Sequence, residues 1–285
     1  MMGSKKISLA AWLGVALLTL SGAALAQQSG QQQNPPPAQQ PADKKPVVQD
    51  LTLDTPAPPV NAEEDAAYKA FTDELDTKKK IQLGEAFVVK YPQSRYRPPV
   101  YSNLTIAYLQ DNNVVKMEEA GEKEIALNPN DGQTLAILGQ TIPRSWNPSA
   151  PDAAQKLEKA EQYSKRALEV VPTMARPEAI TDEQFARAKN QTLAMAHSGL
   201  GLVYVRRGKF AEAISDLEQA VKIDPAPDPV NYYLLGISNQ RASHFEDAVA
   251  AFNKCAQLPG SMAATCKSGA EEAKKLGATQ LSAPK

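Results

Sequence analysis

Residues that could carry out catalysis or hold a metal are few and widely separated in this sequence. There are two histidines, His197 and His244, and two cysteines, Cys255 and Cys266. Metal ligands usually recur at short spacings such as H-x-x-x-H or C-x-x-C, and the sequence has neither pattern. It also has no G-x-S-x-G nucleophile elbow and no G-x-x-x-x-G-K-[ST] phosphate loop. We therefore expect no catalytic residue, no metal site and no cofactor, and no enzyme.

The charges are balanced along the chain. The formal net charge is -1 and the pI is about 6.2. Neither value gives an electrostatic reason to bind nucleic acid or an acidic membrane surface. Acidic pairs such as Glu63-Glu64 and Glu118-Glu119 are typical of solvated helix faces. We therefore expect no nucleic-acid partner.

The N-terminal segment, Met1 to Ala26, has the pattern of a secretory signal peptide. Lys5 and Lys6 form a short positive region, residues 9–20 an apolar core, and Ala24 to Ala26 a small-x-small cleavage site. The apolar run is shorter than the roughly 20 residues that span a membrane. We expect cleavage after Ala26 and an exported chain, periplasmic or secreted. The alternative is an uncleaved N-terminal anchor, which alone would hold the chain at a membrane.

The two cysteines are the sequence's candidate for a covalent link. Export would carry Cys255 and Cys266 into a compartment where disulfides persist. A bond between them would close a loop of about 12 residues and contribute roughly 2–3 kcal/mol. The alternative is that both are simply small buried residues.

Composition divides the rest of the chain into three parts. Residues 27–60 are dominated by Gln and Pro and have no aromatic residue, so we expect a disordered, semi-stiff tether. In residues 61–260, Ala, Leu, Glu, Lys and Gln recur at helical spacing, interrupted by Pro and Gly. Residues 261–285 contain one more helical stretch, expected to be a capping helix and a tail. The fold should be all-α.

A repeated pattern is the most informative feature of residues 61–260. One copy has large, small and helix-ending residues at Leu200, Gly201, Tyr204, Ala213, Leu217, Ala220 and Pro225. A second copy follows with Leu235, Gly236, Ala248, Phe252, Cys255 and Pro259. The step from Gly201 to Ala213 equals the step from Gly236 to Ala248. Weaker copies precede them: Thr105 and Gly139 are spaced like successive copies, although Met117, Gly121 and Glu124 depart from the pattern.

This pattern resembles the tetratricopeptide repeat (TPR), whose period is about 34 residues. The resemblance covers about residues 61–260 and is clearest in the last third. It implies a right-handed α-solenoid of about five TPR-like helical hairpins with a C-terminal capping helix.

Two departures from the period predict special features. The step from Gly139 to Ala160 is longer than the matching step in the later copies. The inserted stretch, residues 142–152 with Pro143, Trp146, Pro148 and Pro151, should be a loop between two helices. A second insertion, at residues 173–193, separates Pro172 from the next repeat. It contains a capping box at Thr181 to Gln184, which predicts one long helix from about Asp182 to Arg207 that projects beyond its neighbours.

The resemblance places the binding site in the groove lined by the first helix of each hairpin. By helical phase, the residues that point into it are Gln140, Arg144, Ser198, Leu202, Arg206, Tyr233, Ile237, Gln240 and Arg241. Arg206 and Arg241 recur one repeat apart, and Arg144 occupies the matching place before the loop. Such arginines could bind carboxylates of a peptide. The alternative is that they are surface arginines paired with nearby Asp and Glu.

These observations favour a periplasmic or envelope adaptor that binds a peptide or partner helix in the groove. Two alternatives belong to other classes. The chain could be a self-assembling structural protein that uses the projecting helix and the Trp146 loop as subunit contacts. It could also hold the substrate of a cell-envelope enzyme.

Overall fold

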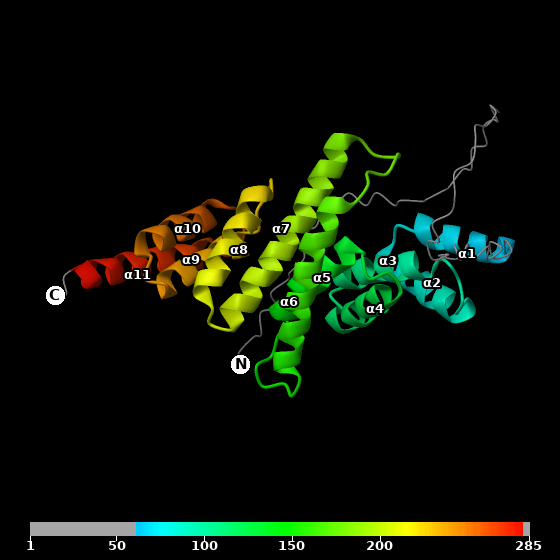
Figure 1. The fold of residues 1–285 in the computed structure, drawn as a ribbon, viewed down its shortest axis with the longest axis horizontal. Coiled ribbons are helices and arrows are strands. Elements are labelled where there is room, and N and C mark those ends of the chain that lie inside the picture. The colour runs from blue at the N-terminus through cyan, green and yellow to red at the C-terminus, as the bar shows by residue number, and fades with distance from the viewer. Residues whose placement is uncertain (1–60, 282–285) are drawn as a thin grey trace, which may run out of the picture. The chain divides into compact units, whose positions relative to one another are not determined.

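The computed structural model describes residues 61–281. The expected signal peptide and the Gln/Pro-rich tether lie outside the described residues. Within the described part every regular element is a helix. The helices, shown in Figure 1, are α1 (Ala62–Asp73), α2 (Thr77–Lys90), α3 (Arg97–Gln110), α4 (Val114–Leu127), α5 (Gly132–Arg144), α6 (Ala153–Val170), α7 (Asp182–Arg206), α8 (Phe210–Ile223), α9 (Pro229–Arg241), α10 (Phe245–Gln257) and α11 (Ala263–Leu281), with a short 3-10 turn at Val171–Thr173.

Consecutive helices pack as pairs. The pairs are α1 with α2, α3 with α4, α5 with α6, α7 with α8, and α9 with α10. The eleventh helix, α11, packs on α10 and also reaches α9. The structure confirms the expected all-α solenoid of five hairpins with a capping helix. No helix among residues 61–281 is both long and apolar enough to cross a bilayer.

The turns inside the second, fourth and fifth hairpins share one backbone feature. Asn112, Gly208 and Ser243 stand at equivalent places after α3, α7 and α9, and each has a positive φ, between 57° and 72°. This left-handed conformation ends the first helix and reverses the chain toward the second. After Asn112 the side chain of Asn113 accepts from the Lys116 N–H at the start of α4, and Asp76 caps α2 in the same way.

A small residue faces a large one in each of the last two hairpins. A Cβ at Gly201 would lie 2.6 Å from Leu217 Cγ, and one at Gly236 would lie 2.7 Å from the Phe252 ring. In the second hairpin the glycine contact is with the next hairpin instead, because Gly121 of α4 lies against Leu138 of α5.

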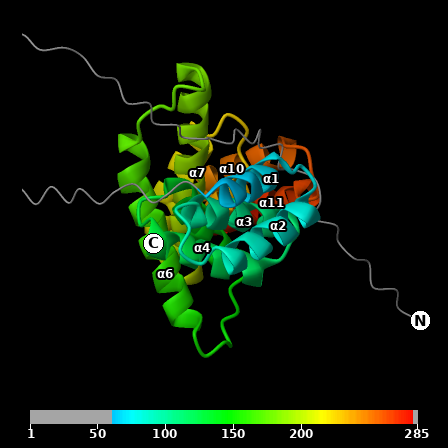
Figure 2. The ribbon, with the colours of Figure 1, turned by 90° about the vertical axis from the view of Figure 1, so that its right-hand side faces the viewer.

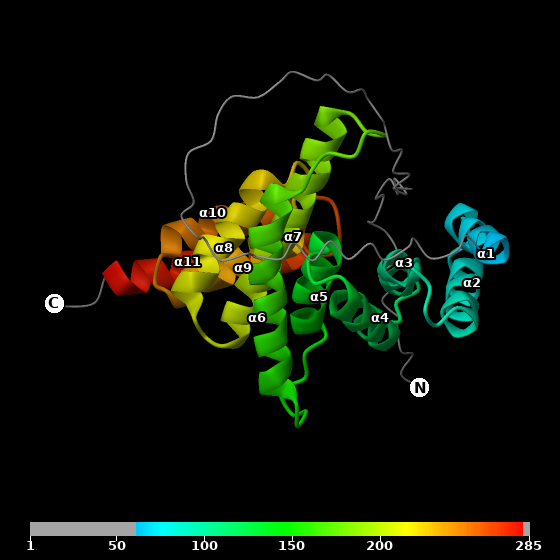
Figure 3. The same ribbon diagram turned by 45° about the vertical axis from the view of Figure 1, so that its right-hand side comes forward.

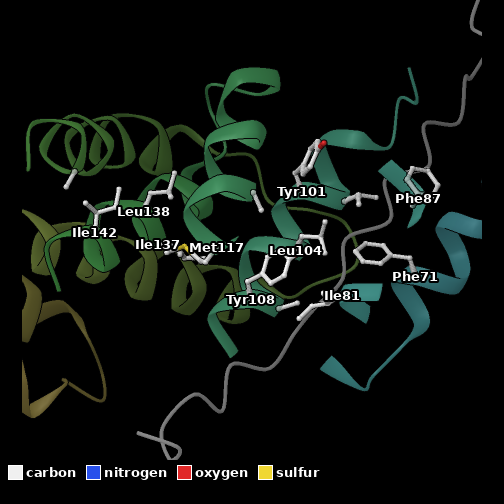
Figure 4. Close-up of a cluster of buried hydrophobic side chains, with 14 of the residues drawn as sticks. Phe71, Ile81, Phe87, Tyr101, Leu104, Tyr108, Met117, Ile137, Leu138 and Ile142 are labelled. Carbon is white, nitrogen blue, oxygen red and sulfur yellow. The ribbon is translucent and has the colours of Figure 1, made fainter. Parts of the chain in front are cut away.

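The core of the first three hairpins is continuous. Phe71, Leu104, Met117 and Leu138 are almost fully buried and belong to one apolar cluster (Figure 4). Phe71 comes from α1 and Leu138 from α5, so the cluster links helices that are far apart in the sequence. Burial of such side chains is the main source of stability in a repeat array.

The long helix is confirmed. The helix α7 spans Asp182–Arg206 and begins with the predicted capping box between Thr181 and Gln184. Figure 2 and Figure 3 show α6 and α7 side by side, with the N-terminal end of α7 extending past the shorter helices. Residues 182–191, at this end of α7, are mostly exposed, whereas residues 198–203 are buried.

The predicted insertion loop is shorter than expected. Trp146, Pro148 and Pro151 do lie between α5 and α6, but Pro143 is inside α5, which continues to Arg144. Proline lacks an N–H, so the carbonyl of Gly139, four residues earlier, receives no helical hydrogen bond from residue 143. The helix tolerates Pro143 because the proline lies in its last turn and is buried.

The structure joins the capping helix to the last hairpin through sulfur. The Sγ atoms of Cys255 in α10 and Cys266 in α11 are 1.94 Å apart, and their Cα atoms are 5.9 Å apart. Both cysteines are fully buried. Nearby, Gly269 of α11 approaches the Phe252 ring, so the same large side chain fills space between three helices.

Candidate functional site

Three arginines occupy matching positions in consecutive hairpins. Arg144, Arg206 and Arg241 are the last residues of α5, α7 and α9. A cation in the last turn of a helix is stabilised by the partial negative charge of the free carbonyl groups there. The three residues thus hold equivalent positions in their hairpins, but their surroundings differ.

Arg144 is paired with an acid. Its terminal amino group donates to Asp228 Oδ2 at 2.9 Å, and both side chains are about one-third exposed. Asp228 is also the N-cap of α9, where it accepts from the N–H of Val230. The ion pair thus connects the third hairpin to the fifth, 84 residues later.

The direct contacts of Arg206 are with neutral groups. Its guanidinium carbon lies 5.7 Å from the centre of the Trp146 ring, and its Nε donates to the Pro143 carbonyl at 3.3 Å. Trp146 is itself held in place, because its indole N–H donates to the Ala153 carbonyl at 2.8 Å. In residues 61–281 no carboxylate forms an ion pair with Arg206. A cation over an indole face is stabilised by the ring's electron distribution.

A pocket of about 670 Å³ opens beside Arg206. Its walls are the 145–152 loop, the start of α6 and the end of α7, and it includes Trp146, Leu157 and Glu161. Arg207 also lines it, and its guanidinium is ion-paired with Glu161. Burial favours the protonated form of Glu161, but hydrogen bonds from Lys165 and Arg207 outweigh this and lower its pKa.

The remaining candidate residues have different neighbours. Ser198 is buried, and its hydroxyl donates to Asn231 Oδ1 at 2.6 Å between α7 and α9. Gln240 donates to Glu272 of the capping helix at 3.1 Å. The Tyr233 ring lies 5.8 Å from the Phe252 ring. Arg241 is exposed and Gln140 is half-buried.

The residues that sequence analysis placed in one groove therefore make separate contacts with different helices. Leu202 is buried, whereas Ile237 packs half-buried on the cluster around Phe252. Trp146, Pro143 and Asp228 were not recognised as partners of the arginines, because each lies far from its arginine in the sequence. The one local feature that could have pointed to the contact with Arg206 was the insertion, which carries the single tryptophan of residues 27–285.

The histidines and buried acids form no metal cluster in the described part of the chain. His197 Nδ1 lies 2.8 Å from Asp216 Oδ1, which links α7 to α8. Glu124 of α4 is almost fully buried, and burial raises its pKa to about 8. The nearby carboxylate of Asp131, at the start of α5, contributes to this rise.

Comparison with known proteins gives one sequence match and several similar structures. The tetratricopeptide repeat family model matches residues 194–227, from the middle of α7 to the loop before α9. None of the curated proteins matches the sequence.

Three solved structures serve as examples of those similar to this chain. A thermophilic TPR protein of Thermus thermophilus is 19% identical, with 74% of this chain and 99% of that chain covered and a TM-score of 0.46. PilW, a type IV pilus biogenesis factor, is 13% identical, with 79% and 96% covered and a TM-score of 0.48. The ArsTM double mutant of MamA RS-1 is 13% identical, with 78% and 99% covered and a TM-score of 0.48.

Residues 194–227 are thus a tetratricopeptide repeat, and the five helical hairpins have the architecture of an array of such repeats. Arrays of such repeats are generally scaffolds for binding other proteins.

Proposed function

We propose that the chain is an adaptor of the cell envelope, exported to the periplasm, that binds a peptide or partner helix along the first helices of its hairpins. The TPR array supports binding of a protein in general. Export is supported by the composition of residues 1–26.

The observation that carries the proposal is the environment of the arginines. Arg144 forms an ion pair with Asp228, and Arg207 forms one with Glu161. Arg206 and Arg241 are exposed cations at equivalent places one repeat apart, and neither has an ion pair within residues 61–281. Exposed arginines without an internal carboxylate are suited to carboxylates of a partner.

Cross-linked capture from the native envelope tests this function. The full chain is compared with the Arg206→Glu, Arg241→Glu double variant, and a partner held by the first should be lost by the second. The matched control is Arg187→Glu with Lys267→Glu, which makes the same charge change at two other exposed positions.

Circular dichroism and the melting temperature show whether each variant is folded. Equal capture by the wild type and a folded Arg206→Glu, Arg241→Glu variant would exclude these arginines from the binding site. Loss of capture by the control variant as well would show that net charge alone is responsible.

A further inference from the structure

The pocket beside Arg206 allows the binding partner's chemistry to be stated more closely, an inference that rests on the proposed function. The pocket exists because of the insertion after α5. In the second, fourth and fifth hairpins a short turn with one left-handed residue joins the two helices, at Asn112, Gly208 and Ser243. Here residues 145–152 form a longer loop, and the guanidinium of Arg206 lies over the ring of Trp146 from this loop.

Two contacts restrain the guanidinium of Arg206 before any partner arrives. Its carbon lies 5.7 Å from the centre of the Trp146 ring, and its Nε–H donates to the Pro143 carbonyl at 3.3 Å. The two terminal amino groups have no carboxylate partner in the described structure. They form one edge of the guanidinium, and such an edge can donate two parallel hydrogen bonds to a carboxylate. Because these contacts restrain the side chain, binding would cost less of its conformational entropy than for a freely moving arginine.

The pocket offers apolar surface next to this cation. Trp146, Pro148 and Leu157 line this open hollow. An apolar side chain placed there would lose its hydration while an adjacent carboxylate reaches Arg206.

The acids of the pocket limit the partner's charge. Arg206 and Arg207 contribute two positive charges, and Glu158 and Glu161 contribute two negative charges. Since Arg207 already pairs with Glu161, only Arg206 remains for a ligand, and the exposed Glu158 would repel a second acid. A run of acidic residues therefore gains nothing over a single one.

We infer that this pocket binds an internal segment of a partner protein in which one Asp or Glu stands next to a large apolar residue. The carboxylate pairs with Arg206, and the apolar side chain packs against Trp146 and Leu157. Arg144 takes no part, because its guanidinium is already ion-paired with Asp228. The partner thus carries an isolated acid beside an apolar residue.

Tryptophan fluorescence gives a direct test in the full chain. The sequence has two tryptophans, Trp12 and Trp146, so a Trp12→Phe chain reports on the pocket alone. The probe is the blocked peptide acetyl-Gly-Ala-Glu-Leu-Ala-Gly-amide, titrated against the emission of Trp146. We expect saturable binding that is about tenfold weaker with Gln in place of the peptide's Glu, because a charge-assisted hydrogen bond is lost.

Variants of the chain complete the test. Arg206→Gln should weaken binding of the Glu peptide about tenfold and leave the Gln peptide unaffected. Arg187→Gln removes an exposed arginine of the same helix and should change neither. The inference is overturned by equal binding of the two peptides, by an Arg206→Gln chain that binds as tightly as its parent, or by no emission change.

Two further peptides show whether the carboxylate that binds comes from one internal side chain, from a chain terminus or from a run of acids. Tighter binding of acetyl-Gly-Ala-Gln-Leu with a free carboxyl end would overturn the internal segment in favour of a chain terminus. Tighter binding of a peptide with three consecutive Glu would overturn the isolated acid. If envelope capture succeeds while Trp146 never responds, this inference fails and the proposed function stands; if peptides bind and nothing is captured, the proposed function fails.

Discussion

Gly199 of α7 lies against the carbonyl group of Gly139 in α5. A Cβ added at residue 199 would be 2.7 Å from Gly139 O and 2.6 Å from the Ser164 hydroxyl oxygen of α6. Three helices therefore meet through two glycines and a serine. The carbonyl concerned is the one that Pro143 leaves without its usual helical N–H. The close approach of α7 and the proline in α5 thus involve the same carbonyl group, that of Gly139.

Gly199→Ala should destabilise the protein. Glycine to alanine within a helix normally stabilises by up to about 1 kcal/mol. At residue 199 the added methyl group would overlap backbone atoms, and overpacking typically costs about 1–3 kcal/mol. Urea denaturation monitored by circular dichroism should give a lower free energy of unfolding for the variant. An increase would show that α5 and α7 are not in this close contact.

Ser164→Ala is the comparison at the same place. The Ser164 hydroxyl is buried and has no hydrogen-bond partner in the described residues. Its removal should leave stability unchanged or raise it by up to about 1–2 kcal/mol, since an unsatisfied polar group is costly. A clear loss of stability would mean that the hydroxyl has a partner after all.

The buried carboxyl group of Glu124 should make the folded protein less stable as the pH rises. Its pKa is raised to about 8 in the folded chain by burial and then by Asp131, whereas in the unfolded chain it is near the ordinary value of 4.5. Between these values the folded state binds more protons than the unfolded state. The free energy of unfolding should therefore drop by about 2–4 kcal/mol between pH 5 and pH 9.

Urea denaturation of the wild type, Glu124→Gln and Glu119→Gln across this pH range provides the measurement. Glu124→Gln should show a much flatter dependence, because the amide does not ionise. Glu119 is an exposed residue of the same helix, so its variant should follow the wild type. Identical slopes for all three chains would exclude Glu124 as the cause.

The bond between Cys255 and Cys266 should stabilise the end of the array. The two residues are 11 apart in sequence, and loops of this length correspond to roughly 2–3 kcal/mol. Cys255→Ser with Cys266→Ser should lower the free energy of unfolding by this amount. Mass measurement after thiol alkylation under denaturing, non-reducing conditions checks the bond itself. Two labelled thiols in the untreated protein would contradict it.

Thr181→Ala should loosen only the projecting end of α7. The Thr181 hydroxyl accepts from the Gln184 N–H at 3.2 Å, and Gln184 Oε1 accepts from the Thr181 N–H at 3.0 Å. Loss of such a cap costs about 1 kcal/mol. Because residues 182–191 bury little surface, we expect faster amide hydrogen exchange there and nearly unchanged global unfolding. A matching change in exchange at residues 194–203 would show that α7 unfolds as one unit.

Local patterns in the sequence determined the helices and their pairing. Spacing of small and large residues predicted the hairpins, the Thr181 capping box predicted the start of α7, and Pro259-Gly260 marked the boundary before α11. These features depend on residues within one or two helical turns, where backbone geometry fixes which side chains meet. The extent of α5 was misjudged because Pro143 usually ends a helix, and only its last-turn position allows it here.

The candidate site depended on contacts that the tertiary structure alone decides. Arg144, Arg206 and Arg241 are equivalent in the repeat, yet one meets Asp228, one meets Trp146 and one is exposed. Asp228 and Trp146 lie far along the chain from their arginines, so no local spacing relates them. Insertions also shift which side chains face each other between hairpins. Repetition in the sequence therefore determines the scaffold, while the irregular residues, packed in three dimensions, determine which arginine remains available to a partner.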